Sequence, residues 1–180
     1  MGKEGEELDK ELEGVWGVEP LGSLGMEKAI FGAGCFWGVE SVFRKVQGVV
    51  DVAVGYCGGE GENPNYQEVC SGQTGYAEVV KIEFDPGVLS FEKLLDVFWG
   101  SHNPSTLNQQ GPDFGTQYRS VIFYLNESQK NLAEASLRNL EELGQYQGSI
   151  ATEITAAGKF YRAEEYHQRY HEKHGGSCQL

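Results

Sequence analysis

Apolar and polar residues follow patterns along this chain that predict four strands. Residues 28–34, Lys-Ala-Ile-Phe-Gly-Ala-Gly, form a short and largely apolar run that is typical of a buried strand. Residues 49–56 and 77–84 alternate apolar with polar side chains, and residues 120–125 form another apolar run. The four runs are far enough apart for helices or long loops to connect them.

Apolar residues at helical spacing predict the helices. In residues 36–46, valine and phenylalanine recur three and four positions apart, and residues 127–143 carry the most regular helical pattern of the chain. Ser90 can cap a further helix that runs to Trp99. Residues 161–174 predict a last helix, which ends before Gly175-Gly176.

Two polar stretches, residues 58–71 and 102–118, are predicted to be long and irregular, and the first contains Gly-Gly, Asn-Pro and Ser-Gly pairs. Long loops in compact domains are often functional. Strands separated by helices, some of them long, favour an α+β fold over a Rossmann fold. We predict a two-layer α/β sandwich with a mixed sheet.

The chain divides into an arm, one domain and a tail. Residues 1–25 contain seven acidic residues, several glycines and little apolar periodicity, so we expect an acidic and mobile N-terminal arm. A length of 180 residues suits one domain, which we place at residues 26–174. Residues 175–180 are predicted to be a flexible tail that carries Cys178.

Charge narrows the choice of partners. The chain has 14 basic and 27 acidic residues and a net charge of −13, which disfavours nucleic acid and anionic membrane as partners. The first ten residues are polar, and no apolar run approaches the length of a membrane span. We therefore expect a cytoplasmic protein.

Cys35 has the context most suited to chemistry, although the four cysteines lack the Cys-x-x-Cys spacing of zinc ribbons and thioredoxin-type pairs. It lies between the first strand and a helix N-terminus, where backbone N–H groups and the helix dipole favour a thiolate and depress the pKa of the thiol. Gly34 lets the backbone turn sharply and approach another molecule.

Phe36 and Trp37 follow this cysteine at a point where helices are often exposed, which favours a substrate-binding pocket. A core cysteine with both aromatic rings packed inward fits the local pattern equally well. Four polar residues are further candidates for the site, although each signal is weak alone. They are Tyr66, Glu78, Asp113 and Tyr118. Glu78 begins a predicted strand, so it fits an ordinary solvent-exposed carboxylate as well.

The motifs taken together resemble the type A methionine sulfoxide reductase family over about residues 31 to 174. In chain order they are Gly34-Cys35-Phe36-Trp37-Gly38, Val54-Gly55-Tyr56 with Gly58-Gly59, Asn63-Pro64, Tyr66 to Gly72, Thr74-Gly75, Ala77-Glu78-Val79-Val80, Phe84-Asp85-Pro86, Leu94-Leu95, Phe98-Trp99, Gln110-Gly111, Asp113, and Gly115 to Ser120. The resemblance implies a ferredoxin-like core. It also implies that Cys35 is the nucleophile, Glu78 the acid, and Tyr66, Tyr118 and Asp113 polar partners.

The family chemistry suits these residue types. The sulfur of a sulfoxide accepts a thiolate when its oxygen is protonated or strongly hydrogen-bonded, which an acid and two phenols can provide. The expected activity is reduction of methionine S-sulfoxide, free or in proteins, as repair after oxidative stress. Phe36 and Trp37 would hold the S-methyl group. The resulting sulfenic acid would form a disulfide that thioredoxin reduces, with no bound cofactor and with a monomeric enzyme.

Cys178 is the first candidate for the resolving thiol, because the glycines before it give it reach and mobility. Cys57 ranks second, as either a packed thiol or an auxiliary redox partner. Cys70 ranks last, since it lies beside a probable strand and is expected to be buried. The chain departs from common family forms at Cys57, at Tyr76, where histidine is frequent, and at Asn103, where aspartate is frequent. The last two departures bear on fine specificity.

Three other functions remain open from the residues alone. A metal site would use His167 and His171, four apart on the predicted last helix, with His174 and Cys178 nearby, but no further motif completes it and we expect no metal. A cysteine hydrolase would need a base near Cys35, for which His102 is the central candidate. A binding module would retain its function when Cys35 is replaced.

Overall fold

The structure is a computed structural model that describes residues 25–176. Cys178 and all but the last residue of the predicted arm lie outside the described residues. Across residues 25–176, no helix combines the length and the apolar character that crossing a membrane requires.

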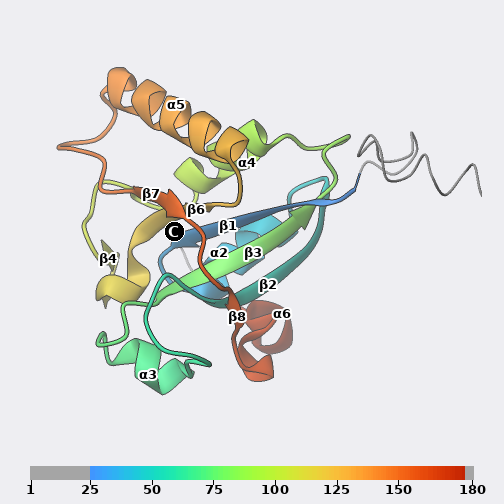
Figure 1. The fold of residues 1–180 in the computed structure, drawn as a ribbon, viewed down its shortest axis with the longest axis vertical. Coiled ribbons are helices and arrows are strands. Elements are labelled where there is room, and N and C mark those ends of the chain that lie inside the picture. Colours follow the sequence, from blue (N-terminus) through green and yellow to red (C-terminus); the bar gives the residue numbers. More distant parts are fainter. Residues whose placement is uncertain (1–24, 177–180) are drawn as a thin grey trace, which may run out of the picture.

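A six-stranded sheet in the order β7-β6-β1-β3-β2-β8 forms the centre of the fold (Figure 1). Each of its four central strands is antiparallel to its neighbours among them. They are β1 (Glu27–Ala33), β2 (Val49–Cys57), β3 (Ala77–Phe84) and β6 (Ser120–Tyr124), with helix α2 (Phe36–Arg44) between β1 and β2 and helix α4 (Phe91–Gly100) between β3 and β6. The spatial order of these strands and the β-α-β-β-α-β connectivity confirm the ferredoxin-like core.

Two short strands extend the core at its edges. β7 (Glu153–Ala156) lies parallel to β6 and follows helix α5 (Glu127–Leu143), whereas β8 (Tyr161–Arg162) lies antiparallel to β2. The sheet is therefore mixed, as predicted.

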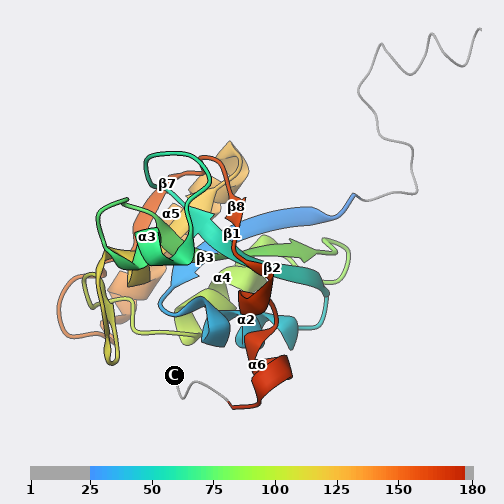
Figure 2. The same ribbon diagram turned by 90° about the horizontal axis from the view of Figure 1, so that it is seen from below.

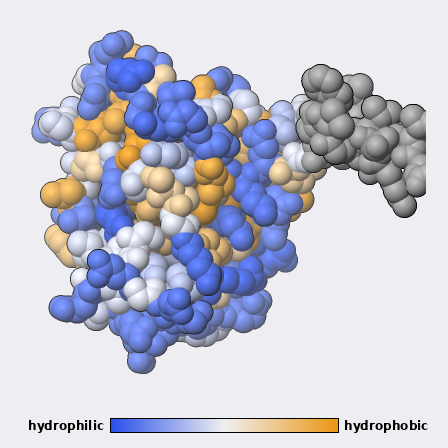
Figure 3. All heavy atoms as spheres, in the orientation of Figure 1, coloured by the Kyte–Doolittle hydropathy of each residue, from blue (hydrophilic) through white to orange (hydrophobic). Residues whose placement is uncertain are grey.

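Helices α2 and α4 cover one face of the sheet, so the core has two layers (Figures 1 and 2). Helix α2 turns Phe36, Val39 and Phe43 toward the sheet, at the i, i+3 and i+7 spacing of one helical face. Phe31 of β1 meets Phe98 of α4 with ring centroids 5.0 Å apart. A smaller apolar cluster lies on the opposite face, which Figure 3 shows to be mostly hydrophilic outside a few apolar groups.

Short elements occupy the long connections and the C-terminal segment. They are α3 (Tyr66–Cys70), β4 (Gln109–Gln110), β5 (Asp113–Phe114), the 3₁₀ turns η1 (Thr116–Tyr118) and η2 (Glu165–His167), and α6 (Tyr170–His174). The predicted first loop thus contains a helix. Asn65 starts α3 with a capping box, in which its side chain accepts from the N–H of Glu68 and the Glu68 side chain accepts from the N–H of Asn65.

The four predicted strands and the first three predicted helices are confirmed, whereas a single helix over residues 161–174 is wrong. That segment pairs with β2 first, and Arg169 then takes a left-handed backbone conformation with φ of 53°. The side chain of Gln168 hydrogen-bonds both the N–H and the carbonyl of Val54. These tertiary contacts outweigh the helical pattern. Strand β7 was not predicted, because its four residues carry little pattern.

Candidate active site

Cys35 stands where β1 ends and α2 begins, and its side chain is half-buried. Gly34 before it has φ of +95°, and a Cβ on Gly34 would lie 2.9 Å from the side chain of Gln110. Only glycine fits such a turn without strain. The thiol consequently lies at the positive end of the α2 dipole, where a thiolate is stabilised.

A cavity of about 780 Å³ opens beside Cys35. Asp113 also lines it, from β5, so two of the predicted site residues share one pocket. The other lining residues are Ala33, Gly100, His102, Asn103, Gln110, Gly111, Pro112 and Tyr146. Most of the wall therefore comes from the long polar connection between α4 and β6.

Glu78 is the buried acid of the site, with 1% of its surface exposed on β3. Its Oε1 accepts from the backbone N–H of Phe36 at 3.2 Å, which places it next to Cys35. Its Oε2 is buried without a hydrogen-bond partner within residues 25–176. Burial raises the pKa of Glu78 to about 8, against the Phe36 hydrogen bond and with help from the Asp113 charge. Glu78 is thus mostly protonated at pH 7.

Tyr66 and Tyr118 bring two phenols to the same region, one from the start of α3 and the other from η1. Both are half-buried, and burial raises the pKa of each well above the usual range for tyrosine. The Glu78 charge acts in the same direction on both, and the charges of Asp113 and Cys35 act on Tyr118. These residues form one electrostatic cluster whose phenols stay neutral and able to donate.

The two aromatic residues after Cys35 point to different places. Phe36 is 1% exposed and packs against Tyr56 and His167, so the expectation that it is exposed is wrong. The reason is that it begins the buried face of α2. Trp37 is half-buried and stacks on Tyr170, with centroids 3.8 Å apart and planes 6° apart.

Of the two remaining described thiols, Cys57 is packed, which was one of its two predicted states, whereas the expected burial of Cys70 is wrong. Cys57 is fully buried, and because it pairs with Ala77 in the sheet it faces away from Glu78. Cys70 is half-buried and hydrogen-bonded to Tyr66 on α3. Burial raises the pKa of both thiols. Of the two, Cys70 is the one beside the polar cluster.

His102 lines the same pocket as Cys35, although nothing in the sequence placed it there. A cysteine hydrolase would need a general base at such a position. Both ring nitrogens are engaged, however. Nδ1 lies 2.8 Å from the carbonyl oxygen of Phe98 and Nε2 lies 2.7 Å from the Ser120 hydroxyl. Burial also lowers the pKa of His102 to about 4. This imidazole is poorly suited to act as a general base.

The proposed histidine face for a metal does not form. His167 lies in η2 and His171 in α6, and the left-handed Arg169 separates them. Within residues 25–176, no group of three or more His, Cys, Asp or Glu side chains is arranged to hold a metal ion. The remaining member of the proposed set, Cys178, lies outside the described residues.

Two residues that differ from the common family forms, Tyr76 and Asn103, lie in different parts of the structure. Tyr76 is buried, and its hydroxyl donates to the carbonyl oxygen of Gly61 within the loop before α3. Asn103 lines the pocket and hydrogen-bonds with Gln110 through its backbone. Asn103 is therefore the departure that borders the cavity directly.

Sequence reasoning missed two residues that contact the site from the C-terminal segment. Glu164 accepts from the N–H of Tyr66 at 3.2 Å and from the Tyr56 hydroxyl at 3.1 Å. His167 was considered only as a metal ligand, yet it accepts from the Trp37 indole at 3.0 Å. These three contacts join positions 98 to 130 residues apart in sequence, so no local signal could have shown them.

Comparison with known proteins gives one consistent result. Residues 27–180 match the family model described as peptide methionine sulfoxide reductase. The chain is 61% identical over 147 residues to a peptide methionine sulfoxide reductase MsrA of Methanothermobacter thermautotrophicus. The aligned residues cover 82% of this chain and 87% of that protein. It is 55% identical to an MsrA of Geobacter sulfurreducens, covering 85% and 95%.

Solved structures agree with these relatives. Reduced Mxr1 of Saccharomyces cerevisiae superimposes with a TM-score of 0.76 at 36% identity, covering 86% of this chain and 90% of that one. The same yeast protein in complex with Trx2 matches with a TM-score of 0.56 at 25% identity, covering 85% and 86%.

Proposed function

Because the chain belongs to the peptide methionine sulfoxide reductase family, whose members are oxidoreductases, we propose that it reduces the S epimer of methionine sulfoxide at Cys35. One observation carries the assignment of the reacting groups. Glu78 is buried, protonated near pH 7, and bonded to the N–H of the residue after the nucleophile. Glu78 therefore places a proton donor beside the thiol of Cys35.

The oxygen of the bound sulfoxide needs donors as the thiolate of Cys35 approaches its sulfur. Glu78 supplies the proton, while the neutral hydroxyls of Tyr66 and Tyr118 donate hydrogen bonds to the oxygen. The oxygen passes to the Cys35 sulfur, which becomes a sulfenic acid, and methionine leaves as the thioether. Asp113, on the pocket wall, acts by keeping Glu78 protonated through its negative charge.

The S-methyl group is held by Trp37, whose half-exposed indole lies in the first turn of α2. Phe36 is 1% exposed, so it supports this wall from the core and does not reach the substrate. Gly34 is buried against the side chain of Gln110, so it contributes by turning the backbone at Cys35.

Recycling requires a second thiol, and we assign it to Cys178. Its thiolate attacks the sulfenic sulfur of Cys35, forms a disulfide and releases water. The dithiol of thioredoxin then reduces the disulfide, which the complex of yeast Mxr1 with Trx2 supports. The burial of Cys57 on the far face of the sheet makes Cys70 the better substitute if Cys178 is removed.

The reaction needs no bound cofactor, and its thiols suit a reducing compartment, so we place the enzyme in the cytoplasm as a monomer. An exposed pocket on a monomer accepts both free methionine sulfoxide and oxidised proteins. The acidic surface makes nucleic acid and anionic membranes unfavourable partners.

Turnover of the two separated sulfoxide epimers with dithiothreitol tests the activity and its stereochemistry together. We expect methionine from the S epimer and none above background from the R epimer. Equal turnover of both epimers would contradict the stereochemical assignment, and turnover of neither would contradict the activity.

Peptide mapping after one turnover without reductant tests the resolving thiol. The wild type should yield a disulfide between Cys35 and Cys178. Cys178→Ser should release about one equivalent of methionine and then stop cycling with thioredoxin, with Cys57→Ser as the matched control that cycles normally. A disulfide from Cys35 to Cys70 in the wild type would replace Cys178 in the mechanism.

A further inference from the structure

His167 is fully buried among aromatic rings that belong to the proposed site. Its ring centroid lies 4.4 Å from that of Tyr66, 5.2 Å from that of Phe36 and 5.6 Å from that of Trp37. The ring of Tyr166 covers it on another side at 4.0 Å. His167 is thus wedged between the residues that follow Cys35 and the phenol from α3.

The hydrogen bond to Trp37 determines which nitrogen of His167 carries the proton. An indole N–H can only donate, so His167 Nδ1, 3.0 Å away, must accept and the neutral ring carries its proton on Nε2. Nε2 has no hydrogen-bond partner within residues 25–176, and the nearest carboxylate oxygen, Oε2 of Glu164, lies 4.0 Å away. Burial lowers the pKa of His167, which favours this neutral form.

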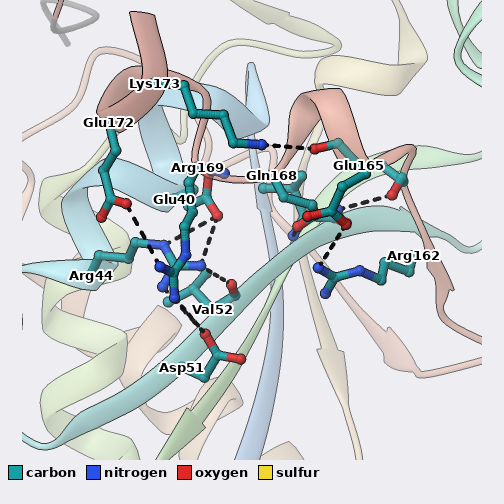
Figure 4. A network of polar contacts seen from close by, with 12 residues as sticks. Glu40, Arg44, Asp51, Val52, Arg162, Glu165, Gln168, Arg169, Glu172 and Lys173 are labelled. Carbon is teal, nitrogen blue, oxygen red and sulfur yellow. Dashed lines mark hydrogen bonds and ion pairs between the residues drawn. The ribbon is translucent and has the colours of Figure 1, made fainter. Parts of the chain in front are cut away.

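The segment that carries His167 is anchored on both sides. After it, the side chain of Gln168 pairs with the backbone of Val54, and the N–H of Arg169 donates to the buried Glu40 of α2 at 2.8 Å (Figure 4). Before it, Glu164 accepts from the N–H of Tyr66 at 3.2 Å. These contacts fix the imidazole relative to both α2 and α3.

We propose that His167 is a positioning residue that orients the Trp37 indole through Nδ1 and supports the Tyr66 ring, so that both face the sulfoxide attacked by Cys35. The proposal rests on the proposed function of Trp37 and Tyr66. It extends that function to a residue that does not touch the substrate. It also explains why a histidine occupies a fully buried position among aromatic rings, since a phenylalanine would fill the space but offer no acceptor.

Two substitutions separate the acceptor from the ring. His167→Phe keeps an aromatic ring and removes Nδ1, whereas the side-chain oxygen of His167→Asn can replace Nδ1 as the acceptor. His174→Phe is the matched control, because it makes the same change in an exposed ring that contacts Tyr170 rather than Trp37.

The indole N–H signals in ¹H–¹⁵N spectra report on the contact directly. The chain has three tryptophans, so three indole signals are expected, and Trp37→Phe identifies the relevant one. In the wild type this N–H should exchange slowly with water. His167→Phe should shift the signal and speed its exchange, while His167→Asn should restore part of the protection.

Steady-state kinetics on the S epimer provide the functional measurement. His167→Phe should raise KM about fivefold, the usual net contribution of one hydrogen bond, with a smaller change in kcat. His167→Asn should recover part of that loss, and His174→Phe should match the wild type.

Three results would overturn the positioning role. They are fast exchange of the Trp37 indole N–H in the wild type, an unchanged indole signal in His167→Phe, and a KM in His167→Phe equal to that of His174→Phe. The first does not depend on His167→Phe, since it needs only the wild type and the signal assignment from Trp37→Phe, and it therefore holds even if His167→Phe fails to fold. A wild type that reduces neither epimer is a different result, because it removes the proposed function itself.

Discussion

On the sheet side of the site, Cys35 lies at the junction of β1 and α2 and Glu78 lies on β3, where regular hydrogen bonding fixes the backbone. On the loop side, Tyr66, Tyr118 and Asp113 stand on elements of two to five residues within long polar connections. The difference follows what each side has to do. An acid that stays protonated needs the deep burial that a sheet provides, while groups that contact a varied substrate have to remain reachable.

The largest loss of activity should come from a substitution on the sheet side, Cys35→Ser. We expect loss of all measurable reduction with the fold intact, because a serine hydroxyl lacks the acidity and nucleophilicity of a thiol. Methionine release in a single turnover is the measurement, with circular dichroism as the check on folding. Turnover near that of the wild type would remove Cys35 from the mechanism.

Glu78→Gln should lower the chemical step by about 10² to 10⁴, because it removes the positioned proton donor while keeping the shape of the side chain. In the wild type, the single-turnover rate should also fall as pH rises through about 8, where Glu78 loses its proton. The variant should lack that fall. Equal single-turnover rates for the two proteins at pH 7 would contradict the role of Glu78.

Substitutions on the loop side should lower the single-turnover rate less than Glu78→Gln does. Tyr66→Phe and Tyr118→Phe should each lower the single-turnover rate about tenfold, since each removes one hydrogen-bond donor to the same oxygen. If the two hydroxyls share that oxygen, the double variant should depart from the sum of the single effects in free energy of activation. Strict additivity would show that the phenols act independently.

The last effect concerns stability rather than rate, and it should again be specific to the sheet side. The folded-state pKa of Glu78, about 8, lies above its ordinary value of 4.5, so the folded state holds a proton that the unfolded state has lost between these values. The free energy of unfolding should therefore fall as pH rises through this window, by about 1.4 kcal/mol per unit of pKa difference. Glu78→Gln should remove that contribution. Urea unfolding at pH 5 and pH 8 measures it, and identical pH dependence in the two proteins would contradict it.

The accuracy of the sequence predictions follows the same division. The strands over residues 28–34 and 77–84, and the helix that starts after Cys35, were predicted because their apolar patterns are local and strong. The helix over residues 161–174 was not realised, because pairing with β2 and the left-handed Arg169 depend on distant parts of the chain. In the site, motif resemblance indicated the reacting residues without their geometry.

The sequence by itself determined the order of the four central strands and of helices α2, α4 and α5, the glycine turn at Gly34 and the family to which the motifs belong, because each depends on residues close together in the chain. Only the tertiary structure decided that Glu78 is buried and has a raised pKa, that Phe36 faces the core, and that His167 contacts Trp37. Those facts depend on burial and on contacts between segments separated by 42 to 130 positions. Such contacts form when the sheet and its covering segments come together.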